Sequence, residues 1–379
     1  MVAARATGAS FRGKGTQAKD VLFLLPAFPE HPRTGGEVYN RHLIDRLRGR
    51  GMNVEVLVLP EINRQPLVAG CRALYRLLAD YRGKARVVVY DTWLYRWLWP
   101  IMAVLRLRTP FRLISFAQLC YWDTYASLLS RTLHRMLTWA ALLPAHRQIA
   151  VSNTILHDDL DPFCGTRKGR VVYPGCDWAD AEVRQADTGR MPAQIVSVAN
   201  YGERKGFHVL VEALARVAER APELSKQLSL RLLGNLEFDP AYVARLRERI
   251  SAAGLTDRVV LDGWKSREEL SGLLAESQLF AFASTSEGFG MVVAEAMLHG
   301  LPVLLSDFNV APELLGGDAE AGYVVPKTDA DAFAAAICEY FTVRDRRNMG
   351  VHARDRAKAL VSTWDHVAEQ FERIISETI

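Results

Sequence analysis

Short apolar runs alternate with segments of helical periodicity along most of this chain of 379 residues. Near-continuous apolar strands are typical of a parallel sheet that helices cover on both faces. The alternation occurs twice, so we predict two doubly wound α/β domains, which the length also favours. The predicted strands are residues 21–25, 54–59, 86–90, 112–116, 148–151 and 170–173 in the first half and 194–199, 228–233, 258–261, 278–283, 302–306 and 323–325 in the second.

Helical periodicity separates most of these runs. The predicted helices include residues 39–50, 69–81, 206–221, 241–253, 267–275, 291–300, 330–341, 344–360 and 364–377. We expect the two domains to face each other across a cleft where the carboxyl ends of both sets of strands meet, because ligands of such sheets bind outside those ends.

Residues 181–193 are polar, contain Gly and Pro and lack periodicity, so they predict a linker between the domains. The expected order is then a flexible tail at 1–19, an N-terminal Rossmann-like domain at 20–180, the linker, a second Rossmann-like domain at 194–362 and a C-terminal helix at 363–379. We expect that last helix to pack back toward the N-terminal domain.

The composition excludes several classes of protein. Hydrophobic residues at 49% and charged residues at 24% describe an ordinary globular chain. No apolar run approaches the length that crosses a bilayer. The five cysteines are scattered, with no CxxC spacing, and indicate reduced cytosolic thiols instead of a disulfide framework or a zinc site.

The net charge of +4 hides an asymmetry between the halves. Residues 1–180 hold 25 Lys and Arg against 14 Asp and Glu, whereas residues 181–379 hold 22 against 29. The first half is therefore strongly basic, and such asymmetry suggests that one half faces an anionic surface.

Residues 284–302 read STSEGFGMVVAEAMLHGLP and place Glu287 and Glu295 around a glycine-flanked turn that opens a helix. Gly288 and Gly290 permit a tight turn and the close approach of a ligand. The first amides of the helix lack partners within it, so its start is a ready anion site. A phosphate between two hydroxyl-rich groups, as in a nucleotide sugar, suits this layout; a helix start with solvated glutamates is the alternative.

Residues 196–208 read VSVANYGERKGFH, which places Arg204 and Lys205 in a loop between a strand and a helix. A leaving diphosphate needs neutralisation, which side-chain cations supply when no metal is bound. Arg presents a planar fork to phosphate and Lys a compact charge. We predict phosphate contacts for this pair, with an ordinary basic loop as the alternative.

Two glycines, Gly234 and Gly263, end predicted strands of the second half. A glycine at such a place lets the chain turn close beside a ligand. Trp264 and Lys265 follow Gly263 and are candidates to border a nucleobase, although an exposed Trp-Lys turn explains them equally well.

Taken in order, residues 194–330 resemble the donor-binding half of the family 4 (GT4) retaining glycosyltransferases, which have the GT-B fold. The resemblance rests on VANYGERKGFHVLVEAL, LLGN, LDGWKSREELSGLLAESQLFAFASTSEGFGMVVAEAMLHGLPVLLSD, PELL and GYVVP. The first half resembles the family less, in a glycine pair and in the segments VSNTILHDDL and VVYPGCD.

The resemblance implies a role for each matching residue. Arg204 and Lys205 would hold the diphosphate, Glu295 would bind the ribose hydroxyls, and Glu287 would face the donor sugar. The remaining donor-binding residues it implies are Gly35, Gly36, Gly234, Trp264, Lys265, Gly288, Phe289, Gly290 and Met291. It also implies that no metal ion or other cofactor is needed.

One departure from the family lies in the first half. Family members often carry a histidine after the fourth strand, near the donor sugar, whereas this chain reads LISFAQLCYWDTY with Gln118 at that position. Gln donates and accepts hydrogen bonds but takes up no proton at neutral pH. Asp91 and Asp123 follow apolar runs and are candidates either for acceptor contacts or for plain capping.

Residues 92–147 contain five tryptophans and seven arginines with Asp123 as the sole acid. Trp and Arg beside apolar residues suit the interface of an anionic membrane. An aromatic core with solvated arginines explains the window equally well. Nothing in it resembles a nucleic-acid-binding motif, so we expect no nucleic-acid partner.

The sequence therefore predicts a retaining, metal-independent hexosyltransferase. It would move a hexosyl group from a UDP- or GDP-linked donor to a hydroxyl of a saccharide or lipid-linked glycan, in polysaccharide or glycolipid synthesis. We expect it in the cytoplasm, peripherally at the inner face of the plasma membrane. The alternatives are a catalytically silent binding protein of the GT-B fold and a nucleotide-sugar epimerase.

Overall fold

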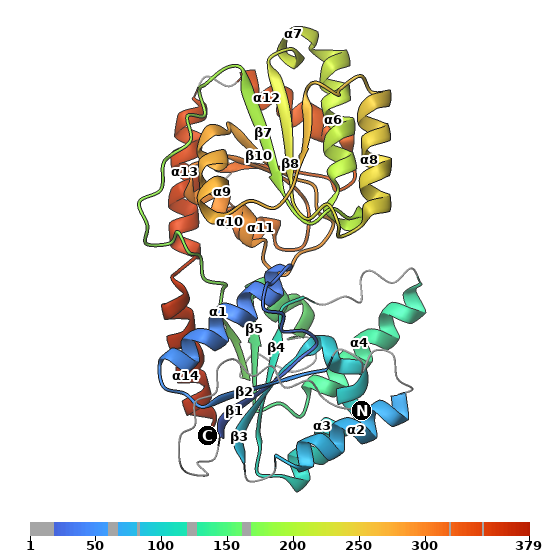
Figure 1. Cartoon of the computed structure of the whole chain (residues 1–379), viewed down its shortest axis with the longest axis vertical. Helices are drawn as coiled ribbons and strands as arrows, with labels where there is room; N and C mark the ends of the chain where they lie inside the picture. The colour runs from blue at the N-terminus through green and yellow to red at the C-terminus, as the bar shows by residue number, and fades with distance from the viewer. Residues whose placement is uncertain are drawn as a thin grey trace. The chain divides into compact units, whose positions relative to one another are not determined.

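The computed structural model describes residues 19–59, 67–81, 84–119, 127–160, 168–317, 320–342 and 345–379. The chain divides into two compact units, the first formed by Met1–Gly175 with Trp364–Ile379 and the second by Cys176–Thr363. Each unit contains one six-stranded parallel sheet with helices on both faces (Figure 1). The predicted doubly wound α/β architecture is confirmed in both halves.

In the first unit the strands lie in the order β2-β1-β3-β4-β5-β6. Each pairs with its neighbours in parallel, for example Val21 beside Val54 and Val87. The strands are β1 (Lys19–Leu25), β2 (Val54–Val58), β3 (Ala85–Asp91), β4 (Arg112–Ala117), β5 (Arg147–Ala150) and β6 (Gly169–Val171).

Two layers of helices cover this sheet. One layer, α2, α3 and α4, packs on the buried side chains of Leu22, Leu24 and Tyr90, whereas Tyr39 of α1 and Phe371 of α14 pack against Phe116 on the other face. The helices are α1 (Gly35–Gly49), α2 (Leu67–Ala79), α3 (Tyr95–Arg108), α4 (Leu128–Leu142) and α14 (Trp364–Thr378), with short turns η2 (Thr92–Leu94) and η4 (Ile155–Leu160).

The second unit has the strand order β12-β11-β10-β7-β8-β9. Its first strand along the chain, β7, lies near the middle of the sheet, so the order reverses there as in dinucleotide-binding folds. The strands are β7 (Ala193–Val198), β8 (Leu228–Leu233), β9 (Val259–Asp262), β10 (Leu279–Phe282), β11 (Val303–Ser306) and β12 (Gly322–Val325).

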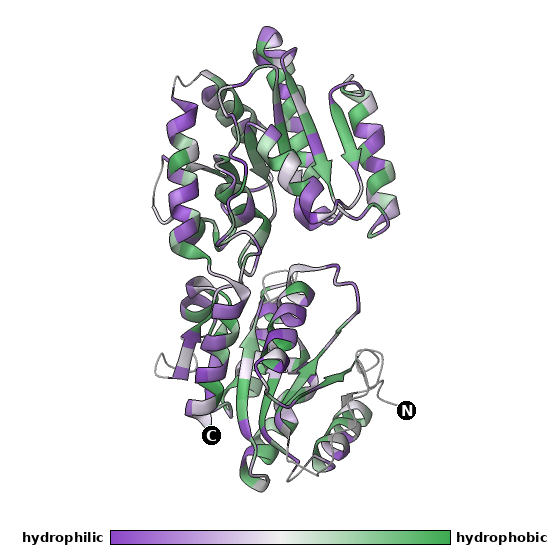
Figure 2. Cartoon of the chain, turned by 60° about the vertical axis from the view of Figure 1, so that its left-hand side comes forward, coloured by the Kyte–Doolittle hydropathy of each residue, from purple (hydrophilic) through white to green (hydrophobic). Residues whose placement is uncertain are grey.

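Helices again flank both faces of this sheet, and α6 and α12 pack side by side. They are α6 (Phe207–Arg220), α7 (Pro222–Ser225), α8 (Pro240–Ala252), α9 (Arg267–Glu276), α10 (Met291–Leu298), α11 (Ala311–Leu315), α12 (Ala330–Thr342) and α13 (Arg346–Leu360), with the single turn η6 (Glu203–Lys205). In each unit hydrophobic residues concentrate on the strands and hydrophilic ones on the outer faces of helices (Figure 2).

The expected boundaries need one correction. Residues 181–193 belong to the second unit, which begins at Cys176, because this irregular segment is tied to that unit by hydrogen bonds. The Ala186 amide donates to the His299 carbonyl at 2.8 Å, and the Arg347 guanidinium reaches the Asp187 carboxylate at 3.2 Å.

The two ends of the chain both belong to the first unit. The C-terminal helix α14 lies against α1, where Trp364 stacks on His42. The tail expected at 1–19 lies outside the described residues except for Lys19, which opens β1. Among the helices that the structure describes, none is long and apolar enough to cross a membrane.

Candidate active site

Arg204 and Lys205 occupy the single turn η6 at the carboxyl end of β7, and the next residue fixes its position. Gly206 has a φ of 68°, in the left-handed region that favours glycine, and begins α6. A Cβ atom at Gly206 would lie 2.2 Å from the Ala283 carbonyl oxygen. Only glycine therefore lets η6 approach the end of β10, where the Thr285 amide donates to the Arg204 carbonyl at 3.0 Å.

Both cations of η6 contact one carboxylate oxygen. The Lys205 Nζ lies 2.5 Å and the Arg204 Nη1 3.3 Å from Glu287 Oε1. Ser284 Oγ donates to the same oxygen at 2.6 Å, and the Glu287 amide donates to Asn309 Oδ1 at 3.1 Å. Glu287, a buried residue, is thus held at both its backbone and its side chain.

The charges of this cluster depend on one another. Burial alone would raise the pKa of Glu287, but Lys205, Arg204 and the Ser284 hydroxyl outweigh it and hold that pKa below the usual range. Burial, together with the nearby Arg204, lowers the pKa of Lys205. Glu287 is therefore an ionised carboxylate that keeps two cations together beside the carboxyl ends of the strands.

Helix α10 begins directly after this cluster. Gly290, with a φ of 92°, is its N-cap and has no side chain to occupy the first amides. Gly288 and the buried Phe289 join Glu287 to this cap. The cations of η6 and the positive end of α10 both favour an anion, so this part of the second unit can hold a phosphate.

Glu295 has a different environment from Glu287. It lies within α10 and is half-buried. Burial raises its pKa to about 8, Asp177 adds to the rise and Arg267 opposes it. Arg267 itself bonds to the Asp177 carbonyl and lies over the Trp178 ring at 5.4 Å from its centroid. A carboxyl group in this state gains from any ligand that brings hydrogen-bond donors or positive charge.

Three other predicted donor residues lie at the ends of β8 and β9. A Cβ at Gly234 would lie 1.7 Å from the Ala199 carbonyl oxygen, so close packing of the backbone already requires this glycine. Lys265 pairs with Asp262 at 2.9 Å, which gives its cation an internal partner. Trp264 is 58% exposed, so its ring is available to stack on a planar group.

Gly36 and Gln118 come together in the first unit. Helix α1 begins at Gly35, and a Cβ at Gly36 would lie 2.2 Å from Gln118 Oε1. Gln118 Nε2 donates to Asn40 Oδ1 at 2.8 Å, which orients the amide over the start of α1.

Of the two candidate acceptor residues, Asp91 and Asp123, the structure describes Asp91. Asp91 is buried at the end of β3 and accepts the Trp93 amide at 2.8 Å, so it caps η2. Burial raises its pKa to about 7. Asp123 lies outside the described residues.

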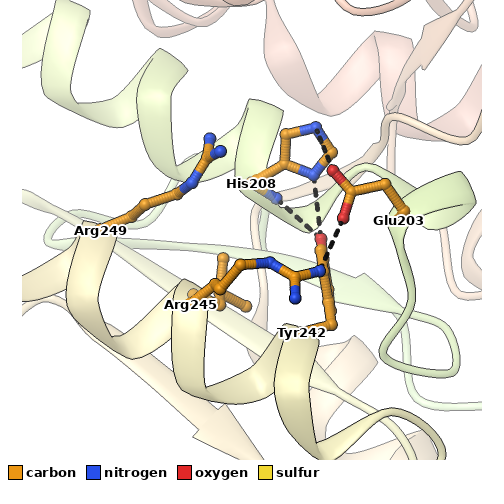
Figure 3. Close-up of a pocket in the computed structure, with 6 residues that line it drawn as sticks. Glu203, His208, Tyr242, Arg245 and Arg249 are labelled. Atoms are coloured by element: carbon orange, nitrogen blue, oxygen red, sulfur yellow. Dashed lines mark hydrogen bonds and ion pairs between the residues drawn. The ribbon is translucent and has the colours of Figure 1, made fainter.

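A second polar network contacts η6 through Glu203. Figure 3 shows Glu203, the first residue of η6, between His208 of α6 and Arg245 of α8. The Tyr242 hydroxyl contacts both the backbone amide and the Nδ1 of His208, at 3.1 and 3.0 Å. These residues border a pocket of only about 10 Å³, which has room for about one water molecule. We assign this network to positioning the turn.

Sequence reasoning missed four residues that shape the site. Ser284 and Asn309 hold Glu287, and Asp177 and Arg267 adjust, in opposite directions, the pKa of Glu295 that burial raises. Ser284 belongs to the same motif as Glu287, and a search for hydroxyl donors near a buried carboxylate could have found it. Asn309, Asp177 and Arg267 lie in other segments, and only the fold brings them near.

No group of three or more His, Cys, Asp and Glu side chains gathers as a metal site would require in the part of the chain that the structure describes. That the chain acts without a metal or cofactor stays a prediction.

Comparison with known protein families finds a match that lies within the second unit. Residues 180–356 match the family model described as Glycosyl transferases group 1. This segment is a group 1 glycosyl transferase domain. It contains η6, Glu287, α10 and Glu295, the features from which the site is built.

Curated relatives that match this domain are named as enzymes that transfer sugars. The chain is 29% identical, over 61% of its length, to an MMP alpha-(1->4)-mannosyltransferase of Mycolicibacterium hassiacum, of which the match covers 54%. It is 30% identical, over 50% of its length, to the amylovoran biosynthesis glycosyltransferase AmsK of Erwinia amylovora, of which the match covers 46%. The chain thus spans about half the length of the curated relatives it matches.

Solved structures extend the likeness to the whole fold. A sucrose-phosphate synthase from Thermosynechococcus elongatus superposes with a TM-score of 0.74 at 20% identity, over 95% of this chain and 99% of that one. Anabaena Alr3699/HepE, solved in complex with UDP, superposes with a TM-score of 0.69 at 18% identity, over 94% and 100%. The expected GT-B fold is confirmed.

Proposed function

We propose that this chain is a retaining hexosyltransferase that uses a UDP- or GDP-linked sugar as donor. The observation that carries the proposal is the cluster of Arg204, Lys205 and Glu287 beside the N-terminus of α10. The named activities of the relatives, which include a mannosyltransferase and an amylovoran biosynthesis glycosyltransferase, support sugar transfer, and the UDP bound to Alr3699/HepE supports a nucleotide donor.

In this mechanism the bond between the anomeric carbon and the diphosphate breaks while that carbon bonds to an acceptor hydroxyl on the same face. The hydroxyl proton passes to an oxygen of the leaving diphosphate, so no side-chain base is required and Gln118 need take up no proton. Arg204, Lys205 and the amides of α10 stabilise the negative charge that grows on the diphosphate. Glu287 keeps both cations in place.

Glu295 would bind the ribose hydroxyls of the donor. The ribose would supply hydroxyl donors to a carboxyl group whose pKa is raised to about 8, and these donors favour its ionised form. Nucleotide binding near neutral pH is therefore expected to release a proton from Glu295.

The acceptor would be a saccharide or a lipid-linked glycan in polysaccharide or glycolipid synthesis, in line with the names of the relatives. A lipid-linked acceptor places the enzyme in the cytoplasm at the inner face of the plasma membrane. The first unit, the more basic half of the chain, would then receive the acceptor.

The test is a turnover assay with UDP- and GDP-hexoses, read as release of nucleoside diphosphate and as the anomeric configuration of the product by NMR. We expect retention, and a loss of at least about a hundredfold in rate in Glu287→Ala. Glu219→Gln, an exposed change on α6, is the matched control and should leave the rate unchanged.

Other outcomes would contradict the mechanism or support one of the two alternative functions, a silent binding protein or an epimerase. An inverted product would contradict the retaining mechanism. Nucleotide binding without turnover would favour a silent binding protein, and interconversion of the sugar without release of nucleotide would favour an epimerase.

A further inference from the structure

Helix α4 of the first unit exposes several large apolar side chains, although Ala141 and Leu142 at its C-terminal end are buried in the core. Leu129, Leu133 and Met136, spaced as one face of a helix, are 81%, 53% and 56% exposed. His134 and Thr138, by contrast, are buried on its inner side. A helix that only covered a sheet would have the opposite arrangement, so the outer face of α4 suits an apolar environment.

Specific contacts fix this orientation. His134 Nδ1 lies 2.6 Å from the Tyr95 hydroxyl of α3, and the Tyr90 hydroxyl of β3 donates to the Ala141 carbonyl of α4 at 2.8 Å. Rotation of α4 to bury its leucines would break the bond to Tyr95 and expose a buried histidine. The exposed face is therefore a built feature of the first unit.

The layer that contains α4 has charge of one sign. Helices α2, α3 and α4 contain no Asp or Glu. Their arginines are Arg72, Arg76, Arg96, Arg106, Arg108, Arg131 and Arg135. On the opposite face of the sheet, α1 and α14 contain several acids, such as Asp45 and Glu372. The three helices on the side where α4 lies thus carry arginines and no acid, whereas α1 and α14 on the other face carry charges of both signs (Figure 1).

The structure also divides the tryptophans of residues 92–147. Trp97 is buried in the core, whereas Trp93 and Trp99 are exposed beside it. Trp122 lies outside the described residues. The interpretation of the window as an aromatic core therefore holds for Trp97 but not for Trp93 and Trp99, and the membrane interpretation stays a prediction.

We propose that the outer face of α4, formed by Leu129, Leu133 and Met136 and flanked by Arg131 and Arg135, binds the surface of an anionic lipid bilayer. The apolar side chains would enter the region between head groups and acyl chains while the arginines meet anionic head groups. The proposal rests on the proposed function in one respect: binding to the bilayer would bring the enzyme to a lipid-linked acceptor.

Charge favours a bilayer over other occupants of this face. A symmetric dimer through α4 would bring arginines against arginines with no acid from these helices to pair them. A nucleic acid would attract the arginines electrostatically but would offer no apolar phase to the three exposed apolar side chains. An anionic bilayer offers both negative charge and an apolar phase.

The test is co-sedimentation of the full chain with vesicles at low salt. We expect binding to vesicles that contain phosphatidylglycerol and little binding to pure phosphatidylcholine. Leu129→Ser combined with Leu133→Ser, and separately Arg131→Glu combined with Arg135→Glu, should each weaken binding at least about tenfold. The matched controls are Val351→Ser on α13 and Arg247→Glu on α8. Both are exposed positions of the second unit, and these changes should leave vesicle binding as it is in the wild type.

Several results would overturn the proposal. They are absence of wild-type binding to anionic vesicles, equal binding by the α4 variants, and a change of oligomeric state in the leucine variant without a change in vesicle binding. Binding of a nucleic acid in preference to vesicles would also count against it. Nucleotide titration of each variant separates the two proposals, because a variant that binds donor but not vesicles has lost only the membrane contact.

Discussion

Glu287 and Glu295 belong to one motif, but the fold gives them opposite electrostatics. Glu287 lies among two cations and a hydroxyl donor and is ionised, whereas burial and Asp177 hold Glu295 toward its neutral form. The sequence identified both residues as ligand-binding candidates. It could not distinguish their charge states, because these depend on residues far apart in the chain, such as Lys205 and Asp177.

Glu287→Gln is expected to destabilise the second unit by about 3 kcal/mol, because it leaves Lys205 buried with no carboxylate beside it. Denaturant unfolding of the variant measures this. Glu219→Gln, which breaks an exposed pair with Arg216, is the control and should change stability by less than about 1 kcal/mol. Equal effects of the two changes would show that the cluster is not a coupled buried unit.

Glu295 predicts a pH dependence of stability. Its pKa is about 8 in the folded chain, against an ordinary value of 4.5, so folding retains a proton that the unfolded chain releases. The free energy of unfolding of the wild type should therefore fall, relative to Glu295→Gln, by about 1–3 kcal/mol as pH rises from about 5 to 8. Unfolding curves of both proteins without nucleotide test this, and a wild-type free energy of unfolding that stays constant or rises relative to Glu295→Gln over this pH range would contradict it.

At the level of elements, Gly206 decides how η6 meets β10. Its positive φ and the nearby Ala283 carbonyl both exclude a side chain. Gly254 has a similar φ of 64° but nothing within 4 Å of a Cβ. Gly254→Ala should then cost about 1 kcal/mol, from the left-handed backbone alone.

Gly206→Ala should cost clearly more, because its backbone neighbour must also move. It should in addition weaken donor binding, since η6 carries Arg204 and Lys205. Thermal unfolding and nucleotide titration of both alanine variants provide the measurements. Similar losses of stability in the two would mean that the approach of η6 to β10 is not tight.

The elements themselves were largely predictable. All twelve predicted strands are present, since near-continuous apolar runs in a parallel sheet are hard to mistake. The exposed apolar face of α4 was not predicted, because the predicted helices do not include residues 128–142 and only the structure shows that His134 lies on the inner side. Periodicity gives the faces of a helix but does not say which face is buried.

At the level of the whole chain, the boundary between the units was the least predictable feature. Residues 181–193 have the composition of a linker, yet hydrogen bonds to the end of α10 make them part of the second unit. Those bonds are backbone interactions between distant segments, which composition does not encode. The family resemblance over residues 194–330, in contrast, lies within the segment 180–356 that the group 1 family model matches.

The most direct test of the account is calorimetric titration of the whole chain with UDP, GDP and ADP and their hexose conjugates. The wild type should bind one nucleotide selectively, and Arg204→Ala should bind it at least about tenfold more weakly while Arg247→Ala, on α8, binds as the wild type does. Binding of no nucleotide, or equal affinity in Arg204→Ala, would contradict a donor site built on η6 and α10.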